Sequence, residues 1–155
     1  MKRNPNLVHL SSEHHDGLVI ALRIKKALDH LQDYQVLIDY IHHLWPSLKH
    51  HFSQEEDNFL AYPTIQKQDK LIKRMLDEHL EFEYIITKIN PDNPDLRNDL
   101  QAFSILLKDH IRFEERLLFP YIEDQLTTQE LAQVGTQLEQ THRPLDANWG
   151  PNFWD

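Results

Sequence analysis

Apolar side chains recur at intervals of three and four residues along most of the chain, which is the spacing of one face of an α-helix. No stretch alternates between apolar and polar residues in the manner of a half-buried strand bounded by turn residues. The chain also holds only three glycines among 155 residues. The pattern therefore predicts an all-helical protein with no sheet.

Breaks in this pattern separate five predicted helices. They cover residues 11–30, 36–61, 65–89, 95–120 and 127–142. Ser11-Ser12-Glu13 offers N-cap chemistry to the first helix, and Thr127-Thr128-Gln129-Glu130 is a capping box for the last. Pro46 predicts a kink or a second helix start within the second segment, and Pro120 predicts a kink or an end of the fourth, because proline removes a backbone donor.

Four long helices joined by short loops favour an up-down-up-down antiparallel four-helix bundle. The fifth predicted helix is a short C-terminal addition, and the tail from Pro144 to Asp155 should be irregular because its aromatic residues are interrupted by Pro and Gly. The expected organisation is an N-terminal extension over residues 1–10, a bundle over 11–125, and a C-terminal helix with an aromatic tail over 126–155.

The charge and composition exclude several classes of function. The chain has 25 acidic residues against 16 Lys and Arg, a formal net charge of -9 that repels a phosphate backbone, so we expect no nucleic-acid partner. The absence of Cys excludes disulfides, thiolate zinc sites and cysteine-held iron–sulfur clusters. No stretch approaches the ~20 apolar residues of a membrane span, so we expect a cytoplasmic protein that does not bind membranes.

Histidine is unusually frequent, with eleven residues, and one histidine in each of the predicted second, third and fourth helices stands four positions before a glutamate. The pairs are His51 with Glu55, His79 with Glu83, and His110 with Glu114. Residues four apart on a helix are about 40° apart around its axis and about 6 Å apart along it, so both heads can reach one ion. Each histidine also has apolar neighbours at helical spacing, which predicts that the pairs face the core.

Antiparallel helices bring such pairs together only if the pairs lie at the same height. From His51 to the end of its predicted helix is ~15 Å of rise, and from about Lys67, near the start of the next helix, to His79 is ~18 Å. Similar counts match His79 with His110, and match His14 or His15 of the first helix with His51. All four helices should therefore contribute at one level, and burying so many imidazoles and carboxylates there requires cations.

Imidazole and carboxylate ligands without thiolate suit iron, with manganese or zinc as possible substitutes. Seven protein ligands are too many for one ion, whereas carboxylates that bridge two ions ~3.5 to 4 Å apart would form a dinuclear centre. Glu56 and Glu115 follow two of the carboxylates directly and are expected to be solvated or to support the ligands. Glu115 stays an alternative to Glu114, because it lies five residues after His110.

This set of residues resembles the hemerythrin-like family, the HHE cation-binding domain, over about residues 10 to 125. The shared features are a first-helix His, a His-x-x-x-Glu in the second helix, a His in the third, and a His-x-x-x-Glu with a trailing Phe-Pro in the fourth. The resemblance implies His15 as the first-helix ligand, because the apolar Leu18 follows three residues later, and leaves His14 as the alternative. The predicted ligands are His15, His51, Glu55, His79, Glu83, His110 and Glu114, with Glu55 and Glu114 as the bridging carboxylates.

The oxygen-carrying members of that family have a second His in the third helix, where this chain has Glu83. A carboxylate there adds negative charge, which favours the ferric state over reversible oxygen carriage. The resemblance implies a protein with two non-haem irons that binds or senses oxygen, nitric oxide or iron, with a small diatomic molecule as the expected ligand. The alternatives are a di-iron enzyme that reduces oxygen, peroxide or nitric oxide with an external electron donor, and an iron-holding or structural bundle that acts through a protein partner.

Overall fold

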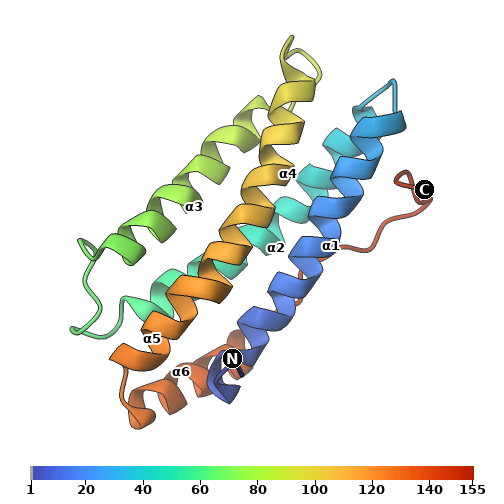
Figure 1. The fold of residues 1–155 in the computed structure, drawn as a ribbon. Coiled ribbons are helices and arrows are strands. Elements are labelled where there is room, and N and C mark those ends of the chain that lie inside the picture. The colour runs from blue at the N-terminus through green and yellow to red at the C-terminus, as the bar shows by residue number, and fades with distance from the viewer. Residues whose placement is uncertain (1) are drawn as a thin grey trace.

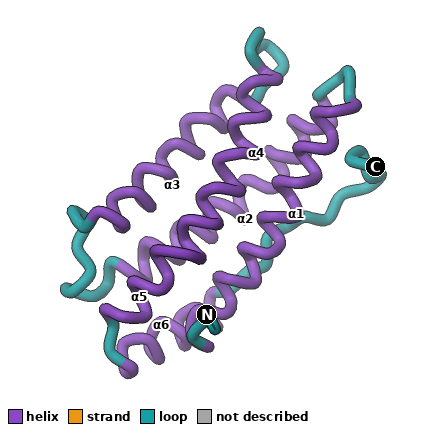
Figure 2. The backbone as a smooth tube through the Cα atoms, in the orientation of Figure 1, coloured by secondary structure: helices purple, strands orange, loops and turns teal. Residues whose placement is uncertain are grey.

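The computed structural model describes residues 2–155, and within that range the chain is all-helical, with no strand. The helices are α1 (Val8–His30), α2 (Gln35–Phe59), α3 (Lys70–Lys88), α4 (Leu96–Phe113), α5 (Phe119–Gln125) and α6 (Thr128–Thr141), with a 3-10 turn η1 (Pro5–Leu7) and a π-helical turn η2 (Glu114–Leu118). Figures 1 and 2 show the four long helices side by side, with α6 across one end near the N-terminus. The prediction of an all-helical protein is confirmed.

Helices α1 and α4 run antiparallel and make the closest approach. Arg97 Nη1 donates a hydrogen bond to the Leu28 carbonyl at 2.6 Å, and seven residues later Ser104 Oγ donates to the Ala21 carbonyl at 2.9 Å, seven residues earlier on α1. Further along, a Cβ atom on Gly17 would lie only 2.6 Å from Ile111 Cδ1, so any other residue there would force the Ile111 side chain to shift. The contact brings the N-terminal half of α1 against the C-terminal half of α4.

The buried side chains form two apolar clusters with a polar layer between them. One cluster lies toward the α1–α2 and α3–α4 turns and includes Ile20, Phe52, Phe82 and Leu107. The other lies toward α5 and α6 and includes Leu10, Phe59, Met75 and Leu118. On every long helix the buried histidine or glutamate residues stand between a member of one cluster and a member of the other. The fold therefore places the polar layer inside the molecule, with apolar packing on both sides.

The helix boundaries differ from the predicted ones at three places. Helix α1 begins at Val8 instead of Ser11, because η1 precedes it and the Asn4 side chain caps this turn by accepting from the Asn6 N–H at 2.9 Å. Helix α2 continues through Pro46 without a second start. Helix α3 begins only at Lys70, since residues 60–69 form turns.

Pro120 does not end the fourth predicted helix, which continues through η2 into α5. In η2 the Phe119 N–H donates to the Glu114 carbonyl, five residues earlier. In the same pattern Pro120 would face the Glu115 carbonyl but has no N–H to offer. That carbonyl accepts from Arg3 Nη2 at 2.7 Å instead, so a residue from the N-terminal segment replaces the missing backbone donor.

The C-terminal part follows the prediction. Helix α6 has the predicted capping box, with the Thr127 hydroxyl accepting from the Glu130 N–H and the Glu130 carboxylate accepting from the Thr127 N–H. The tail after it is irregular and lies along α1 and α2 (Figure 1). The Arg23 guanidinium stacks 4.1 Å from the Trp154 ring, and Trp149 packs edge-on against Tyr40. The aromatic residues of the tail therefore cover the outer surface of α1 and α2.

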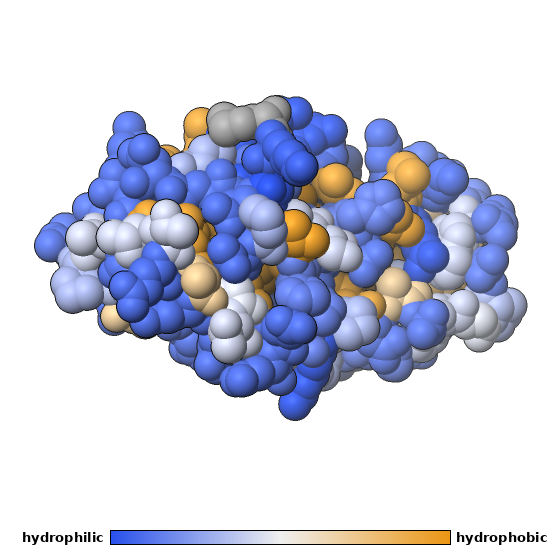
Figure 3. Space-filling view, turned by 90° about the horizontal axis from the view of Figure 1, so that it is seen from below, coloured by the Kyte–Doolittle hydropathy of each residue, from blue (hydrophilic) through white to orange (hydrophobic). Residues whose placement is uncertain are grey.

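The face seen from below is mainly hydrophilic (Figure 3). In the view from below, apolar residues appear only as small separate patches among charged and polar ones (Figure 3). None of the helices in residues 2–155 combines the length and the apolar character that crossing a membrane requires.

Candidate metal centre

Six buried side chains from the four long helices and η2 meet in the polar layer. They are His14, His51, Glu55, His79, His110 and Glu114, none more than 4% exposed. They form two groups of four that share Glu55 and Glu114, and within each group the potential ligand atoms all lie within 4.8 Å of one another. One group adds His14 and His51 to the shared carboxylates, and the other adds His79 and His110.

Each shared carboxylate lies between the two histidine pairs. Glu55 Oε2 is 3.3 Å from His51 Nε2, and Glu55 Oε1 is 3.2 Å from His79 Nε2. Glu114 Oε1 is 2.9 Å from His14 Nε2 and 3.2 Å from His110 Nε2. All four imidazoles thus direct Nε2 toward the two carboxylates, which is the arrangement of two cation sites joined by bridging carboxylates.

The other nitrogen of each imidazole contacts a second set of glutamates, called here the carboxylate ring. The contacts are Glu13 to His51 Nδ1 (3.3 Å), Glu56 to His79 Nδ1 (2.7 Å), Glu78 to His110 Nδ1 (2.7 Å) and Glu115 to His14 Nδ1 (2.8 Å). Each helix supplies the carboxylate for the histidine of the next helix along the chain, and η2 closes the circle back to α1. A carboxylate on Nδ1 holds the proton there and leaves the Nε2 lone pair for a cation.

The carboxylate ring is itself held in place by other side chains. His142 Nδ1 contacts Glu13 Oε2 at 3.0 Å, Arg74 Nε donates to Glu78 Oε2 at 2.9 Å, and Ser11 Oγ donates to Glu115 Oε2 at 2.9 Å. His142 directly follows α6, so the end of the C-terminal helix reaches the surroundings of the centre.

The carboxylates raise the pKa values of all four imidazoles. Burial alone would lower the pKa of His51, but Glu55 and Glu13 outweigh it and raise that pKa to about 9. Burial alone would likewise lower the pKa of His110, but Glu114 and Glu78 outweigh it and raise that pKa to about 9. The same competition raises the pKa values of His14 and His79. Burial alone would raise the pKa of Glu55, but His51, Glu114 and His14 together outweigh it and hold that pKa well below its ordinary value. Protons and metal ions therefore compete for the same nitrogen atoms.

Several inward-facing atoms of the centre have no hydrogen-bond partner. These buried atoms are both carboxylate oxygens of Glu55, Oε2 of Glu114, and Nε2 of His79 and His110. Buried polar atoms are nearly always paired, and leaving several carboxylate and imidazole atoms unpaired at one point is costly. Cations between the two carboxylates would satisfy all of them, so the donor set fits metal ions.

Five of the seven predicted ligands lie in this centre, namely His51, Glu55, His79, His110 and Glu114. On the first helix the structure places His14, the alternative, in the centre, whereas His15, the predicted ligand, is exposed. The apolar Leu18 pointed to His15, yet Leu18 is 37% exposed, and the buried position three residues after His14 is Gly17, against Ile111. A glycine at a helix contact is not recognised as a buried apolar position when the spacing of large apolar residues is used to find the buried face.

Glu83 also lies outside the centre. It is exposed and its Oε1 is 3.8 Å from Lys49 Nζ at the surface. The buried face of α3 runs from Met75 through His79 to Phe82, so the position after Phe82 has turned toward solvent. Helix α3 therefore contributes one residue to the centre, although its sequence carries the same four-residue spacing as α2.

Two members of the carboxylate ring, Glu13 and Glu78, are absent from the sequence-based set. Glu56 and Glu115 were expected to be solvated or to support the ligands, and the structure places them on His79 and His14. A signal was present, because each ring glutamate is directly next to a residue of the centre in the sequence. Adjacent helical residues are about 100° apart around the axis, so such a neighbour turns toward the next helix.

Comparison with known proteins agrees with this geometry. A family model described as the hemerythrin HHE cation binding domain matches residues 6–122. The chain belongs to the hemerythrin HHE cation-binding family. This confirms the resemblance found in the sequence. A relative from Nostoc sp. named DNA nickase is 22% identical over 128 residues, which cover 79% of this chain and 36% of the relative. No solved structure matches the chain.

In this HHE domain a small cavity adjoins the centre. Its lining combines His14, His51 and His110 with Glu13 and the apolar residues Leu48, Phe52, Leu107, Ile111 and Leu145. Its volume of about 10 Å³ has room for roughly one water-sized molecule. Leu145 belongs to the C-terminal tail, so the tail closes one side of the cavity.

A second opening reaches the other side of the centre from the surface. A cleft of about 330 Å³ lies between α2 and α3, and its lining includes His79, Glu56 and Glu83. Glu83 thus lies on the wall of a cleft that leads to one of the histidines, and not among the groups that surround the two shared carboxylates.

Proposed function

We propose that the chain is a non-haem di-iron protein that binds or senses a small diatomic molecule, oxygen or nitric oxide, inside an up-down-up-down bundle of α1 to α4. The observation that carries this proposal is the sharing of Glu55 and Glu114 by two histidine pairs. A single ion would not need two such groups, whereas two ions joined by both carboxylates use every inward-facing atom of the centre.

The residues divide evenly between the two sites. His14 and His51 would hold one iron and His79 and His110 the other, and Glu55 and Glu114 would be shared by both sites. Each ion would then have ligands from four residues of the chain. When bound, the irons would supply redox-active Lewis-acid chemistry with coordination positions left for a small molecule.

The residues around the centre suit a small neutral ligand. Apart from the histidines and Glu13, the cavity beside the centre is lined by apolar side chains, and it has room for roughly one water-sized molecule. The apolar clusters on both sides of the polar layer exclude bulk water. The carboxylate ring holds protons at the Nδ1 atoms and keeps the four imidazoles in one orientation.

The metal content of the purified full chain tests the centre. After expression with iron and without chelator, elemental analysis should give about two irons per chain. Glu55→Ala and His14→Ala should lose most of the iron, because each substitution removes a proposed ligand. The matched controls are Glu83→Ala and His15→Ala, which remove an exposed glutamate and an exposed histidine and should retain it.

Circular dichroism of each variant separates loss of ligands from loss of fold. Equal iron in His14→Ala and His15→Ala, with both proteins helical, would contradict the ligand set. Titration of the iron-loaded protein with nitric oxide then tests whether the centre binds a diatomic molecule. Saturation at a fixed stoichiometry supports binding or sensing, whereas continued consumption with an added electron donor would favour the alternative, an enzyme that reduces the molecule.

We do not propose nickase activity for this chain on the basis of the Nostoc relative. The shared region is 36% of that protein, so the nickase activity can reside in parts that this chain does not match. The formal net charge of -9 also disfavours binding to a phosphate backbone.

A further inference from the structure

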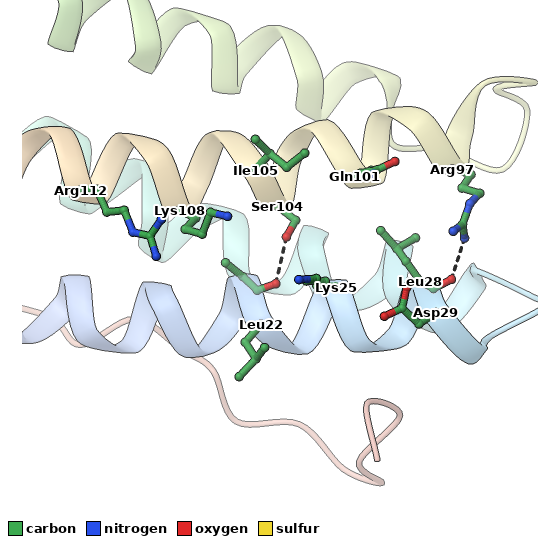
Figure 4. A pocket seen from close by; sticks show the side chains of 11 residues that line it. Leu22, Lys25, Leu28, Asp29, Arg97, Gln101, Ser104, Ile105, Lys108 and Arg112 are labelled. Carbon is green, nitrogen blue, oxygen red and sulfur yellow. Dashed lines mark hydrogen bonds between the residues drawn. The ribbon is translucent and has the colours of Figure 1, made fainter.

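A groove of about 490 Å³ lies between α1 and α4, and none of the six residues of the metal centre lines it (Figure 4). Its base includes Ala21 and Ser104, whose hydrogen bond of 2.9 Å ties the two helices together. Ligand sites of small molecules commonly have volumes of ~300 to 1,000 Å³. The groove is therefore large enough for a small organic molecule.

One part of the groove is cationic. Lys25 of α1 and Lys108 and Arg112 of α4 line it, and within residues 2–155 none of the three makes an ion pair within 4.0 Å. Figure 4 shows Lys25 and Lys108 pointing toward each other on either side of Ser104, with Arg112 one turn beyond Lys108. Three unpaired cations that converge on a groove in a protein of net charge -9 favour an anionic ligand.

The far end of the groove has a different character. Arg97 donates to the Leu28 carbonyl and the Tyr34 hydroxyl, at 2.6 and 2.8 Å, so its guanidinium is already bound within the chain. Asp29, the carboxylate among the lining residues, lies at this same end (Figure 4). An anion is therefore attracted to the Lys108 end and repelled from the Asp29 end.

Large apolar side chains form the two rims between these ends. Leu22 on α1 is 51% exposed and Ile105 on α4 is 46% exposed. A ligand that lay along them would remove apolar surface from water while its charged group stayed with the lysines and Arg112.

The dimensions of the groove define the shape of the ligand. From Arg97 to Arg112 the lining residues of α4 recur every three or four positions, which corresponds to ~22 Å of helix. Spread over that length, a volume of about 490 Å³ describes a long and narrow groove. This elongated shape suits an alkyl chain.

We propose that this groove binds an amphipathic organic anion, with its carboxylate or phosphate between Lys25, Lys108 and Arg112 and its apolar chain along Leu22 and Ile105. The site is independent of the metal centre. The two sources of such a headgroup are a fatty acid and an alkyl phosphate or lipid phosphate.

Isothermal titration calorimetry of the full iron-loaded chain tests the site with three probes that share one alkyl chain. The probes are dodecanoate, dodecyl phosphate and dodecanol, each used below the concentration at which it aggregates. One molecule of an anionic probe should bind per chain, at least tenfold more tightly than dodecanol. The tighter of the two anions identifies the source of the headgroup.

Variants locate the binding. Lys108→Gln with Arg112→Gln should weaken the anionic probes at least tenfold, and Leu22→Asn should weaken both anions about equally. The matched control is Lys26→Gln with Arg116→Gln, which removes the same charge from exposed positions on α1 and η2 outside the groove. This control should change binding less than twofold.

Four outcomes would overturn the proposal. They are no binding of either anion, equal loss in the two double variants, dodecanol binding as tightly as dodecanoate, and inorganic phosphate binding as tightly as dodecyl phosphate. A glutamate-rich helical peptide that bound where the alkyl anions did not would likewise replace this site with a protein-docking surface.

Discussion

Each imidazole of the centre faces carboxylates with both nitrogens, and the two sides differ. On the inward side Nε2 faces the two shared carboxylates, whereas on the outer side the carboxylate ring contacts Nδ1 and sets proton position and ring orientation. Changes to such outer partners typically lower metal affinity 10- to 100-fold in metalloproteins.

Glu56→Gln isolates this effect at one histidine. The amide keeps the size of the side chain but loses the charge that supports His79 Nδ1 at 2.7 Å. We expect iron affinity to fall roughly tenfold or more, measured by competition with a chelator of known affinity. Glu83→Gln is the control, because Glu83 lines the same cleft without contacting His79. The same loss in both variants would mean that overall charge, and not the contact to Nδ1, governs affinity.

How far the residues of the centre can be predicted from the sequence depends on the kind of contact involved. The spacing within one helix identifies His51 with Glu55 and His110 with Glu114, because both members of each pair share a buried face. The same spacing fails for Glu83, because it does not show whether the residue three or the residue four positions after His79 is buried. In α3 the buried residue is Phe82, three positions after His79. The choice of His14 depends on Gly17 and a neighbouring helix, so it becomes visible only when α1 and α4 are placed together.

At the scale of the helices, η2 is the feature that the sequence did not reveal. Pro120 predicts a kink or an end, and the chain instead changes to a π-helical turn whose extra carbonyl is satisfied by Arg3. The turn places Glu114 toward the shared centre and Glu115 toward His14. The N-terminal segment therefore supports the geometry of two carboxylates that lie more than 100 residues away.

Replacing Arg3 by Ala tests that support. The substitution leaves the Glu115 carbonyl without its donor and removes the 2.8 Å ion pair with Glu123. An unsatisfied buried group costs about 1–3 kcal/mol, so the free energy of unfolding should fall by about that amount in urea denaturation. Lys2→Ala, at an exposed neighbouring position, should change it by less than about 0.5 kcal/mol. Equal stability of the two variants would show that the hydrogen bond from Arg3 does not stabilise η2.

The other helices were predicted well where local sequence decides them. The capping box at Thr127 and the break at Asn90 to Pro94 mark helix ends directly. The start of α1 was placed too late, because Val8 follows η1 without a break and the cap belongs to Asn4. Pro46 does not start a second helix, because α2 keeps one buried face on both sides of it.

For the molecule as a whole, the acidic net charge and the cationic groove lie in different places. The carboxylates at the centre and in the carboxylate ring favour cations inside the bundle, while Lys25, Lys108 and Arg112 present positive charge on the outside of α1 and α4. The same chain is thus suited to hold metal ions internally and to attract an organic anion at its surface.

The stability of the whole molecule should depend on pH in opposite ways with and without metal. In the metal-free protein the pKa values of His51 and His110 are raised to about 9, so their protonated forms stabilise the fold. This contribution is fully present below the ordinary pKa of ~6.5 and is lost as the pH rises through about 9. The rise from ~6.5 to about 9 corresponds to roughly 3 kcal/mol at one imidazole. The free energy of unfolding of the metal-free chain should therefore fall between pH 6.5 and 9.

The iron-loaded protein should not show this fall, because its imidazoles are neutral ligands and give up their protons on binding. It should instead lose iron on acidification, as protons displace the metal from the same Nε2 atoms. Urea denaturation of both forms across this pH range, followed by circular dichroism, measures the two trends. His15→Gln should leave the metal-free slope unchanged, since His15 is exposed, whereas His51→Gln should reduce it. A metal-free stability that stays level or rises from pH 6.5 to 9 would show that the carboxylates do not hold protons on the imidazoles, and the competition between protons and metal would then have no basis in this centre.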